Sequence, residues 1–251
     1  MTHSLARWQD RVALVTGASS GIGRATARRL AAGGMKLVLA ARREDRLRAL
    51  AEELSGAEVL THVTDLRDPA SIDALFRATR ARFGGVDVLI NNAGLGRAEP
   101  LVSGDTEAWR EMLEVNVLAL CICTREAVTD MRTRGDDGHV IHISSMAAHR
   151  VPGGSGVYSA TKYAVRSLTE GLRLELRGLG SGIRVTALSP GFVETEFAAV
   201  YHRSDDAAAS TYGRFKVLED VDVAEAVAFT LSAPAHMQVH DMLIRPTDQP
   251  S

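Results

Sequence analysis

Tyr158 and Lys162 are the two side chains whose types and spacing best fit acid–base chemistry. They stand at positions i and i+4 of a segment expected to be helical, so both lie on one helix face. A free tyrosine has a pKa of about 10 and transfers protons poorly at neutral pH. A neighbouring ammonium favours the phenolate and lowers the tyrosine pKa. The pair therefore predicts proton transfer to or from a substrate oxygen, although the same spacing also occurs on ordinary solvated helix faces.

Two serines, Ser144 and Ser145, end an apolar run upstream of this segment. Open α/β proteins bind their ligands at the carboxyl edge of the sheet, where such a strand ends. A serine hydroxyl in that place can donate a hydrogen bond to the substrate oxygen that the tyrosine serves. The sequence thus predicts a site in which serine, tyrosine and lysine act together on one oxygen atom.

A glycine-rich segment near the amino terminus, TGASSGIG, fits the chemistry of phosphate binding. Gly17, Gly21 and Gly23 let the backbone turn tightly and approach a pyrophosphate closely. The helix that follows presents N–H groups and a positive dipole end to the anion. Ser19 and Ser20 add hydroxyl donors. A glycine-rich turn alone is a weak signal, but its position after the first strand favours a dinucleotide site over a plain tight turn.

The end of the second strand-like run indicates which dinucleotide is bound. Sites selective for NAD usually carry Asp or Glu about 20 residues after the glycine-rich loop, where the carboxylate binds the ribose hydroxyls. Here this place reads AARR and ends in Arg42 and Arg43, whose guanidinium groups suit a 2′-phosphate. We therefore predict NADP(H), with Arg42 as the main contact and Ser19 or Arg43 assisting. In the alternative, the two arginines are solvent-exposed at the start of the following helix and form ion pairs with Glu44 and Asp45.

These residues occur within a regular alternation of strands and helices. Most of the apolar runs are continuous rather than alternating, as strands covered on both faces require. We expect strands at residues 12–16, 37–41, 59–63, 86–91, 140–144, 183–189 and 242–245. We expect helices at residues 21–32, 44–54, 68–83, 106–131, 158–179 and 222–231.

This alternation predicts a single α/β domain of the Rossmann type over residues 1–251. Its core would be a doubly wound, seven-stranded parallel sheet flanked by helices. The chain carries no repeat, charge block or Pro/Ser-rich linker that would divide it. Residues 192–217 depart from the pattern because they are polar and Ala-rich without a clear strand pattern. A long insertion of this kind indicates a lid or a binding loop.

Composition excludes several classes of protein. The 251 residues are 45% apolar and 24% charged, which suits a full hydrophobic core and not a disordered chain. The net charge of −2 gives no general attraction to nucleic acid or membranes, and no apolar run approaches the roughly 18 residues of a membrane helix. Without a secretory signal, and with Cys121 and Cys123 on different sides of a helix, a cytoplasmic protein without a metal site is expected.

Four motifs, taken in their order along the chain, resemble those of the short-chain dehydrogenases/reductases. They are TGASSGIG, NNAG at residues 91–94, Ser145 thirteen residues before the YxxxK of Tyr158, and PGFVET at residues 190–195. The resemblance covers nearly the whole chain, and the combination is highly specific. Further segments, among them YSATKYAV and TEGLR, are similar to those of NADP-dependent carbonyl and hydroxysteroid reductases in this family.

The resemblance implies a role for each matching catalytic residue. Ser145 would orient and polarise the substrate oxygen, and Tyr158 would pass a proton to or from it. Lys162 would lower the tyrosine pKa and bind the nicotinamide ribose. Asn116 would hold a local helix opening and a water that relays protons to Lys162. From its place in the sequence alone, Asn116 is as well explained as a buried helix asparagine.

The resemblance also implies a set of cofactor contacts. The glycine-rich loop, including Ile22, would hold the pyrophosphate. The remaining residues are expected at the adenine (Asp65 and Leu66), at the ribose (Asn92, Ala93 and Gly94) and at the nicotinamide (Pro190, Gly191, Val193 and Thr195).

The function that these features predict is reversible hydride transfer between NADPH and a ketone or aldehyde. Residues 96–101, 147–156 and 192–217 are expected to set substrate choice, with Ala147 and Phe192 joining the serine and tyrosine as substrate contacts. Two alternatives stay open: an NAD-linked alcohol dehydrogenase, and a non-catalytic NADP-binding regulator, which would be expected to have lost the serine, tyrosine or lysine. The two longest expected helices carry apolar residues outside the single face that would pack on the sheet. These extra apolar residues favour a homo-oligomer, either a dimer or a tetramer.

Overall fold

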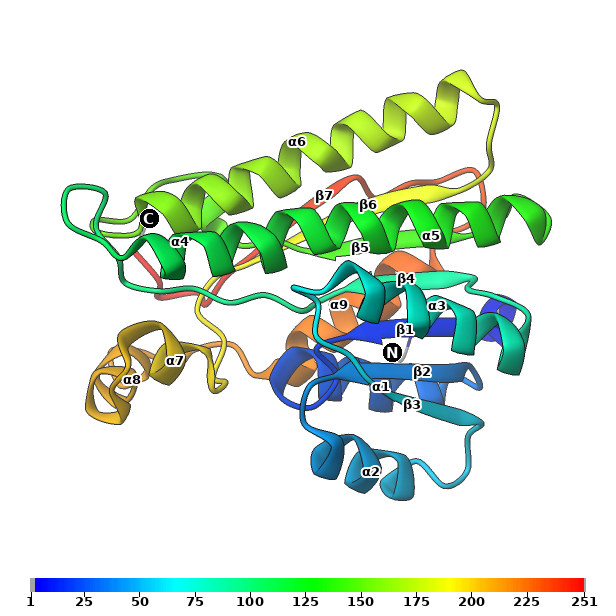
Figure 1. Ribbon diagram of the computed structural model, residues 1–251, viewed down its shortest axis with the longest axis horizontal. Helices are drawn as coiled ribbons and strands as arrows, with labels where there is room; N and C mark the ends of the chain where they lie inside the picture. Colours follow the sequence, from blue (N-terminus) through cyan, green and yellow to red (C-terminus); the bar gives the residue numbers. More distant parts are fainter. Residues whose placement is uncertain (1–2, 251) are drawn as a thin grey trace.

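The computed structural model describes residues 3–250, and within them seven parallel strands form one sheet (Figure 1). The strands are β1 Val12–Thr16, β2 Lys36–Ala41, β3 Val59–Val63, β4 Val88–Asn91, β5 His139–Ile143, β6 Arg184–Pro190 and β7 Asp241–Ile244. Their spatial order is β3-β2-β1-β4-β5-β6-β7. The order reverses direction at β1, so the predicted doubly wound parallel sheet is confirmed.

Helices cover both faces of the sheet (Figure 1). One face carries α1 Gly21–Ala32, α2 Glu44–Glu53 and α9 Asp220–Ser232, and the other carries α3 Pro69–Phe83, α5 Ala119–Thr133 and α6 Gly156–Gly178. Strand β1 shows the consequence for its residues. Ala13 and Val15 belong to the first core, whereas Val12 and Leu14 belong to the second. Because successive side chains point to opposite faces and both faces are covered, every residue of β1 is buried.

The observed bounds differ from the predicted ones by at most two residues for all seven strands and for these helices, with one exception. The predicted helix over residues 106–131 is not continuous. It consists of α4 Thr106–Leu113, a π-helical turn η2 Glu114–Leu118 and α5. Such a turn adds one residue to the helical repeat, and no hydrophobic periodicity marks it in the sequence. It contains Asn116, where the family resemblance implied a local helix opening.

Residues 192–217 were expected to form a lid or a binding loop, and the structure shows that the segment is partly helical, with α7 Phe197–His202 and α8 Asp205–Tyr212. Ser204 is the N-cap of α8, and its hydroxyl accepts a hydrogen bond from the Ala207 N–H at 3.2 Å. The Tyr212 hydroxyl ties the two helices to the chain before them, accepting from the Ala198 N–H and donating to the Thr195 carbonyl. In Figure 1, α7 and α8 stand apart from the two helical layers.

Candidate active site

Four neighbouring strands end at one edge of the sheet and bring the candidate residues around a single cavity. Gly17 follows β1, residues 92–94 follow β4, Ser145 follows β5 and Gly191 follows β6. The carboxyl ends of parallel strands meet at the same edge, which is where open α/β sheets bind ligands. The cavity has a volume of about 700 Å³ and is lined by residues from all four places.

Nearly every residue predicted for the site lines this cavity; only Gly23 and Asn116 do not. The structure also adds residues that the sequence did not single out, among them Leu95, Tyr201 and Gln249. Within residues 3–250, no group of three His, Cys, Asp or Glu side chains could hold a metal ion. No helix in that range is long and apolar enough to cross a membrane.

The glycine-rich loop has the geometry of a phosphate cradle. Gly17 has a φ of +68°, and a Cβ placed on Gly23 would stand 2.4 Å from the Gly17 carbonyl oxygen, so the loop and the first turn of α1 touch. Ser20 is the N-cap of α1, but its side chain makes no capping hydrogen bond. The first N–H groups of α1 therefore keep their capacity to bind an anion. These features fit the pyrophosphate of a dinucleotide.

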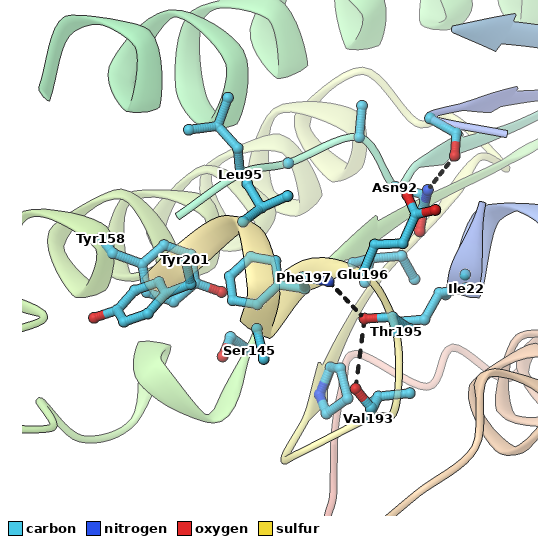
Figure 2. A pocket seen from close by; sticks show the side chains of 18 of the residues that line it. Ile22, Asn92, Leu95, Ser145, Tyr158, Val193, Thr195, Glu196, Phe197 and Tyr201 are labelled. Carbon is cyan, nitrogen blue, oxygen red and sulfur yellow. Dashed lines mark hydrogen bonds between the residues drawn. The ribbon is translucent and has the colours of Figure 1, made fainter. Parts of the chain in front are cut away.

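Asn92 holds this loop from the neighbouring strand. Its Nδ2 donates to the Thr16 carbonyl oxygen at 2.8 Å, and its backbone N–H donates to the Thr16 hydroxyl at 3.1 Å. The Asn92 side chain lies at the cavity in Figure 2. The asparagine expected at the ribose thus also fixes the end of β1 and the start of the cradle.

Tyr158 lies in the first turns of α6 and is only 9% exposed. Burial raises the pKa of Tyr158 to about 12, the Ser145 hydroxyl lowers that pKa, and Tyr201 raises it. The Lys162 Nζ lies 5.9 Å from the Tyr158 ring centroid and donates to the Ile143 carbonyl oxygen at 3.0 Å. Within the protein itself, the tyrosine pKa is therefore raised and not lowered as expected. Tyr158 is protonated at neutral pH and suited to donate a proton.

Ser145 is placed by its position at the N-cap of the short 3-10 helix η3 Met146–Ala148. Its Oγ accepts a hydrogen bond from the Ala147 N–H at 3.1 Å. A hydroxyl that accepts in this way keeps its own hydrogen for a substrate oxygen. Figure 2 shows Ser145 beside an aromatic group of Tyr158, Phe197 and Tyr201, in which the Tyr158 ring centroid is 5.5 Å from Phe197 and 6.0 Å from Tyr201.

Asn116 lies in the π-helical turn η2 and is 2% exposed. Its Nδ2 donates to the Leu95 carbonyl oxygen at 2.8 Å and to the Thr161 hydroxyl at 3.0 Å, while its Oδ1 accepts from the Leu95 N–H at 2.9 Å. A Cβ placed on Gly94 would lie 3.3 Å from the Asn116 Oδ1 and 3.4 Å from the Lys162 Nζ. Asn116 therefore lies behind the cavity wall and connects three segments of the site.

Replacing Asn116 by alanine is expected to lower the free energy of unfolding by about 2–3 kcal/mol, because the Leu95 backbone and the Thr161 hydroxyl would lose buried partners. Denaturant unfolding measures this change. We also expect turnover to fall at least tenfold, since the chain beside Lys162 loses its anchor. Asn91→Ala is the control, because buried Asn91 bonds to Thr124 and His142 instead. Equal losses of turnover in the two variants would contradict a particular role for Asn116.

The two arginines differ in their surroundings although both line the cavity. Arg42 is exposed. Arg43 is half-buried, and its guanidinium donates to the hydroxyls of Ser19 and Ser20 at 2.7–3.2 Å. It also forms an ion pair with Glu196, which the sequence did not single out. Asp65, expected at the adenine, forms an ion pair with Arg67, which lowers the pKa of Asp65 to about 2.

The carboxyl-terminal tail reaches the same cavity. Gln249 is buried, its Oε1 accepts from the Phe192 N–H at 3.0 Å, and its Nε2 lies 3.1 Å from the Met146 Sδ. Gly191 lies under this side chain, since a Cβ on Gly191 would stand 2.2 Å from the Gln249 Oε1. The tail follows the last strand, β7, and has no periodicity of its own, so its place could not be derived from the sequence pattern.

Comparisons with known proteins relate the chain to one family by sequence and to several solved structures by fold. A model of the short chain dehydrogenase family matches residues 11–206. Dehydrogenase/reductase SDR family member 11 of Bos taurus is 52% identical over 251 residues, covering 97% of this chain and 98% of the relative. The closed form of serine dehydrogenase complexed with NADP+ has a TM-score of 0.89 and 35% identity, covering 96% of both chains. A short chain dehydrogenase/reductase from Burkholderia phymatum in complex with NAD has a TM-score of 0.83 and 33% identity, covering 94% of this chain and 89% of that chain.

Proposed function

The chain belongs to the short-chain dehydrogenase family, and from that premise we propose that it reduces ketones or aldehydes with NADPH and catalyses the reverse oxidation. One observation carries this proposal: Ser145, Tyr158 and Lys162 line the same cavity as the glycine-rich cradle. The three proposed catalytic residues and the proposed dinucleotide site therefore line one cavity, which a single substrate could occupy. When bound, the nicotinamide cofactor supplies the hydride, and the protein supplies positioning, protons and electrostatics.

The chain's own residues act on the substrate oxygen. In a reduction, negative charge grows on that oxygen, and hydrogen bonds from the Ser145 and Tyr158 hydroxyls stabilise the charge. Tyr158 then gives its proton to the oxygen, which its raised pKa permits because the group is protonated at neutral pH. The buried Lys162 ammonium stabilises the phenolate that remains. In the oxidation, Tyr158 takes the proton back.

The walls of the cavity support an apolar carbonyl substrate. Tyr158, Ala147 and Met112 form a buried cluster against which Leu95 and Tyr201 pack. We propose that residues 192–217 act as a lid over this substrate, with Phe192 and Ala147 in contact with it. The test is a panel of ketones, aldehydes and carboxylate-bearing carbonyl compounds. The rate of reduction of each compound is measured by the loss of NADPH absorbance. Apolar compounds are expected to react best, and absence of turnover across the whole panel would contradict the proposal.

We propose NADP(H) as the cofactor because Arg42 and Arg43 both line the cavity, with Arg43 beside Ser19 of the cradle. Replacing both arginines by alanine is expected to raise the Kd of NADPH at least tenfold, since charge-assisted hydrogen bonds to the 2′-phosphate are lost. The Kd of NADH should change less than threefold. Fluorescence titration measures both constants, and Arg48→Ala on the exposed side of α2 is the control. Tighter binding of NADH than NADPH by the wild-type protein would overturn this assignment.

A homo-oligomer is supported by a second surface, a groove between α5 and α6 that is lined by Leu120, Val128, Leu168 and Leu172 among others. Leu174 on α6 is also more than half exposed. We propose that this face meets a second copy of the chain, giving a dimer or tetramer. We place the enzyme in the cytoplasm, which the free thiols of Cys121 and Cys123 support. Light scattering on purified protein measures the oligomeric state, and a monomer would contradict the proposed homo-oligomer.

A further inference from the structure

Glu196 connects the segment proposed as a lid to the arginines at the end of β2. Its Oε2 lies 2.8 Å from the Arg43 Nη1, and its Oε1 lies 2.5 Å from the Arg46 Nη1. Glu196 directly precedes α7 and lines the cavity. In Figure 2 its side chain points away from the aromatic group around Tyr158. The carboxylate therefore lies on the dinucleotide side of the cavity and not with the substrate contacts.

The Arg43 guanidinium uses each of its nitrogen atoms in this arrangement. Its Nη1 donates to Glu196, its Nη2 donates to the Ser20 and Ser19 hydroxyls, and its Nε donates to Ser19. A phosphate group binds arginine best through two parallel N–H donors on one edge. One edge of Arg43 faces serine hydroxyls, which can rotate and donate to a phosphate themselves. The edge formed by Nη1 and Nη2 is shared with a carboxylate, which can only accept and which repels an anion.

We propose that Glu196 is a specificity-determining residue for the cofactor, because its carboxylate occupies the position at Arg43 that a 2′-phosphate needs. This inference rests on the proposed NADP(H) function. A 2′-phosphate that binds the Nη1–Nη2 edge of Arg43 has to displace the carboxylate, and one that binds the Nε–Nη2 edge is repelled by it. A dinucleotide without that phosphate leaves the ion pair in place. Glu196 therefore weakens the binding of NADPH selectively and narrows the preference for NADPH over NADH.

The surroundings of Glu196 allow this exchange. The side chains of Arg43 and Glu196 are 39% and 49% exposed, and ion pairs this exposed are individually weak. After leaving Arg43, the carboxylate keeps Arg46 as a partner. Hydrogen bonds from Arg46 and Arg43 lower the pKa of Glu196 to about 2, so the group is a full anion throughout the neutral pH range. Its competition with a phosphate is therefore constant at physiological pH.

The test is Glu196→Gln, which keeps the shape of the side chain and removes the charge. Calorimetry or fluorescence titration gives the Kd of NADPH, NADH, adenosine 2′,5′-bisphosphate and 5′-AMP. We expect E196Q to bind NADPH and the bisphosphate about fivefold more tightly than the wild type, with NADH and 5′-AMP changed less than twofold. Glu194→Gln is the matched control, because Glu194 is exposed, stands two residues earlier and belongs to neither ion pair.

A double-mutant cycle with Arg43→Ala identifies the path of the effect. In R43A, the further change E196Q is expected to improve NADPH binding less than twofold, because the contested guanidinium is gone. The inference is overturned if E196Q weakens NADPH and NADH equally, which would make Glu196 only a lid contact, or if E194Q gives the same gain as E196Q. It is also overturned if E196Q leaves the Kd of NADPH unchanged. Failure of the wild-type protein to bind either dinucleotide would instead contradict the proposed function.

Discussion

Tyr158→Phe is expected to lower the turnover of carbonyl reduction about 10³-fold while the Kd of NADPH stays within threefold of the wild-type value. The hydroxyl is the proton donor to the substrate oxygen, and a positioned general acid contributes about 10²- to 10⁴-fold. Phenylalanine keeps the ring that packs against Phe197 and Tyr201, so the pocket wall and the fold are expected to persist. Steady-state kinetics and NADPH titration separate the two quantities.

Tyr163→Phe is the control for this experiment. Tyr163 lies on the same helix, α6, but is 40% exposed and does not line the cavity. Loss of the Tyr163 hydroxyl should leave turnover within about twofold of the wild-type value, because substitutions on the surface away from the site usually have small effects. Near-wild-type turnover of Y158F would remove Tyr158 from the acid–base role. A large increase in the Kd of NADPH in Y158F would show that the hydroxyl acts in cofactor binding instead.

The second large effect is expected for Lys162→Met, which replaces a buried ammonium by an apolar chain of similar length. We expect turnover to fall about 10²-fold or more and the Kd of NADPH to rise about tenfold, because the ammonium stabilises the phenolate and is proposed to bind the nicotinamide ribose. The Ile143 carbonyl oxygen also loses its donor. Lys36→Met is the control, because Lys36 lies at the amino end of β2, away from the cavity, and pairs with Glu58.

The pH profile gives Lys162 an independent signature. Burial lowers the pKa of Lys162 to about 8, so the group carries its charge below pH 8 and loses it as the pH rises further. Carbonyl reduction by the wild-type protein is therefore expected to be level near pH 7 and to fall above about pH 8. The protonated form of Tyr158 does not limit this range, since its pKa is about 12. In K162M the fall near pH 8 should disappear, and its persistence would assign it to another group.

Much of the fold could be predicted from the sequence because its signals are local. Continuous apolar runs such as that of β1 require cover on both faces, and strand–helix alternation then leaves few topologies. The N-cap Asp68 with Pro69 at the first helical position locates the start of α3, and the side chain of Asp68 does accept from the Ala70 N–H. The family was also predictable, since the order and spacing of four motifs are themselves properties of the sequence.

The sequence determined which residues carry the chemistry. The tertiary structure decided where these residues lie and which charged groups lie near them. Tyr158 and Lys162 share a helix face by their spacing, but their pKa values depend on burial among segments distant in sequence. The π-helical turn around Asn116 and the contact of Gln249 with the cavity have no periodic signal. The ion pair between Glu196 and Arg43 joins residues that no local pattern relates. Desolvation and long-range electrostatics arise only when the chain closes around the cavity, so they could not be derived from residue spacing alone.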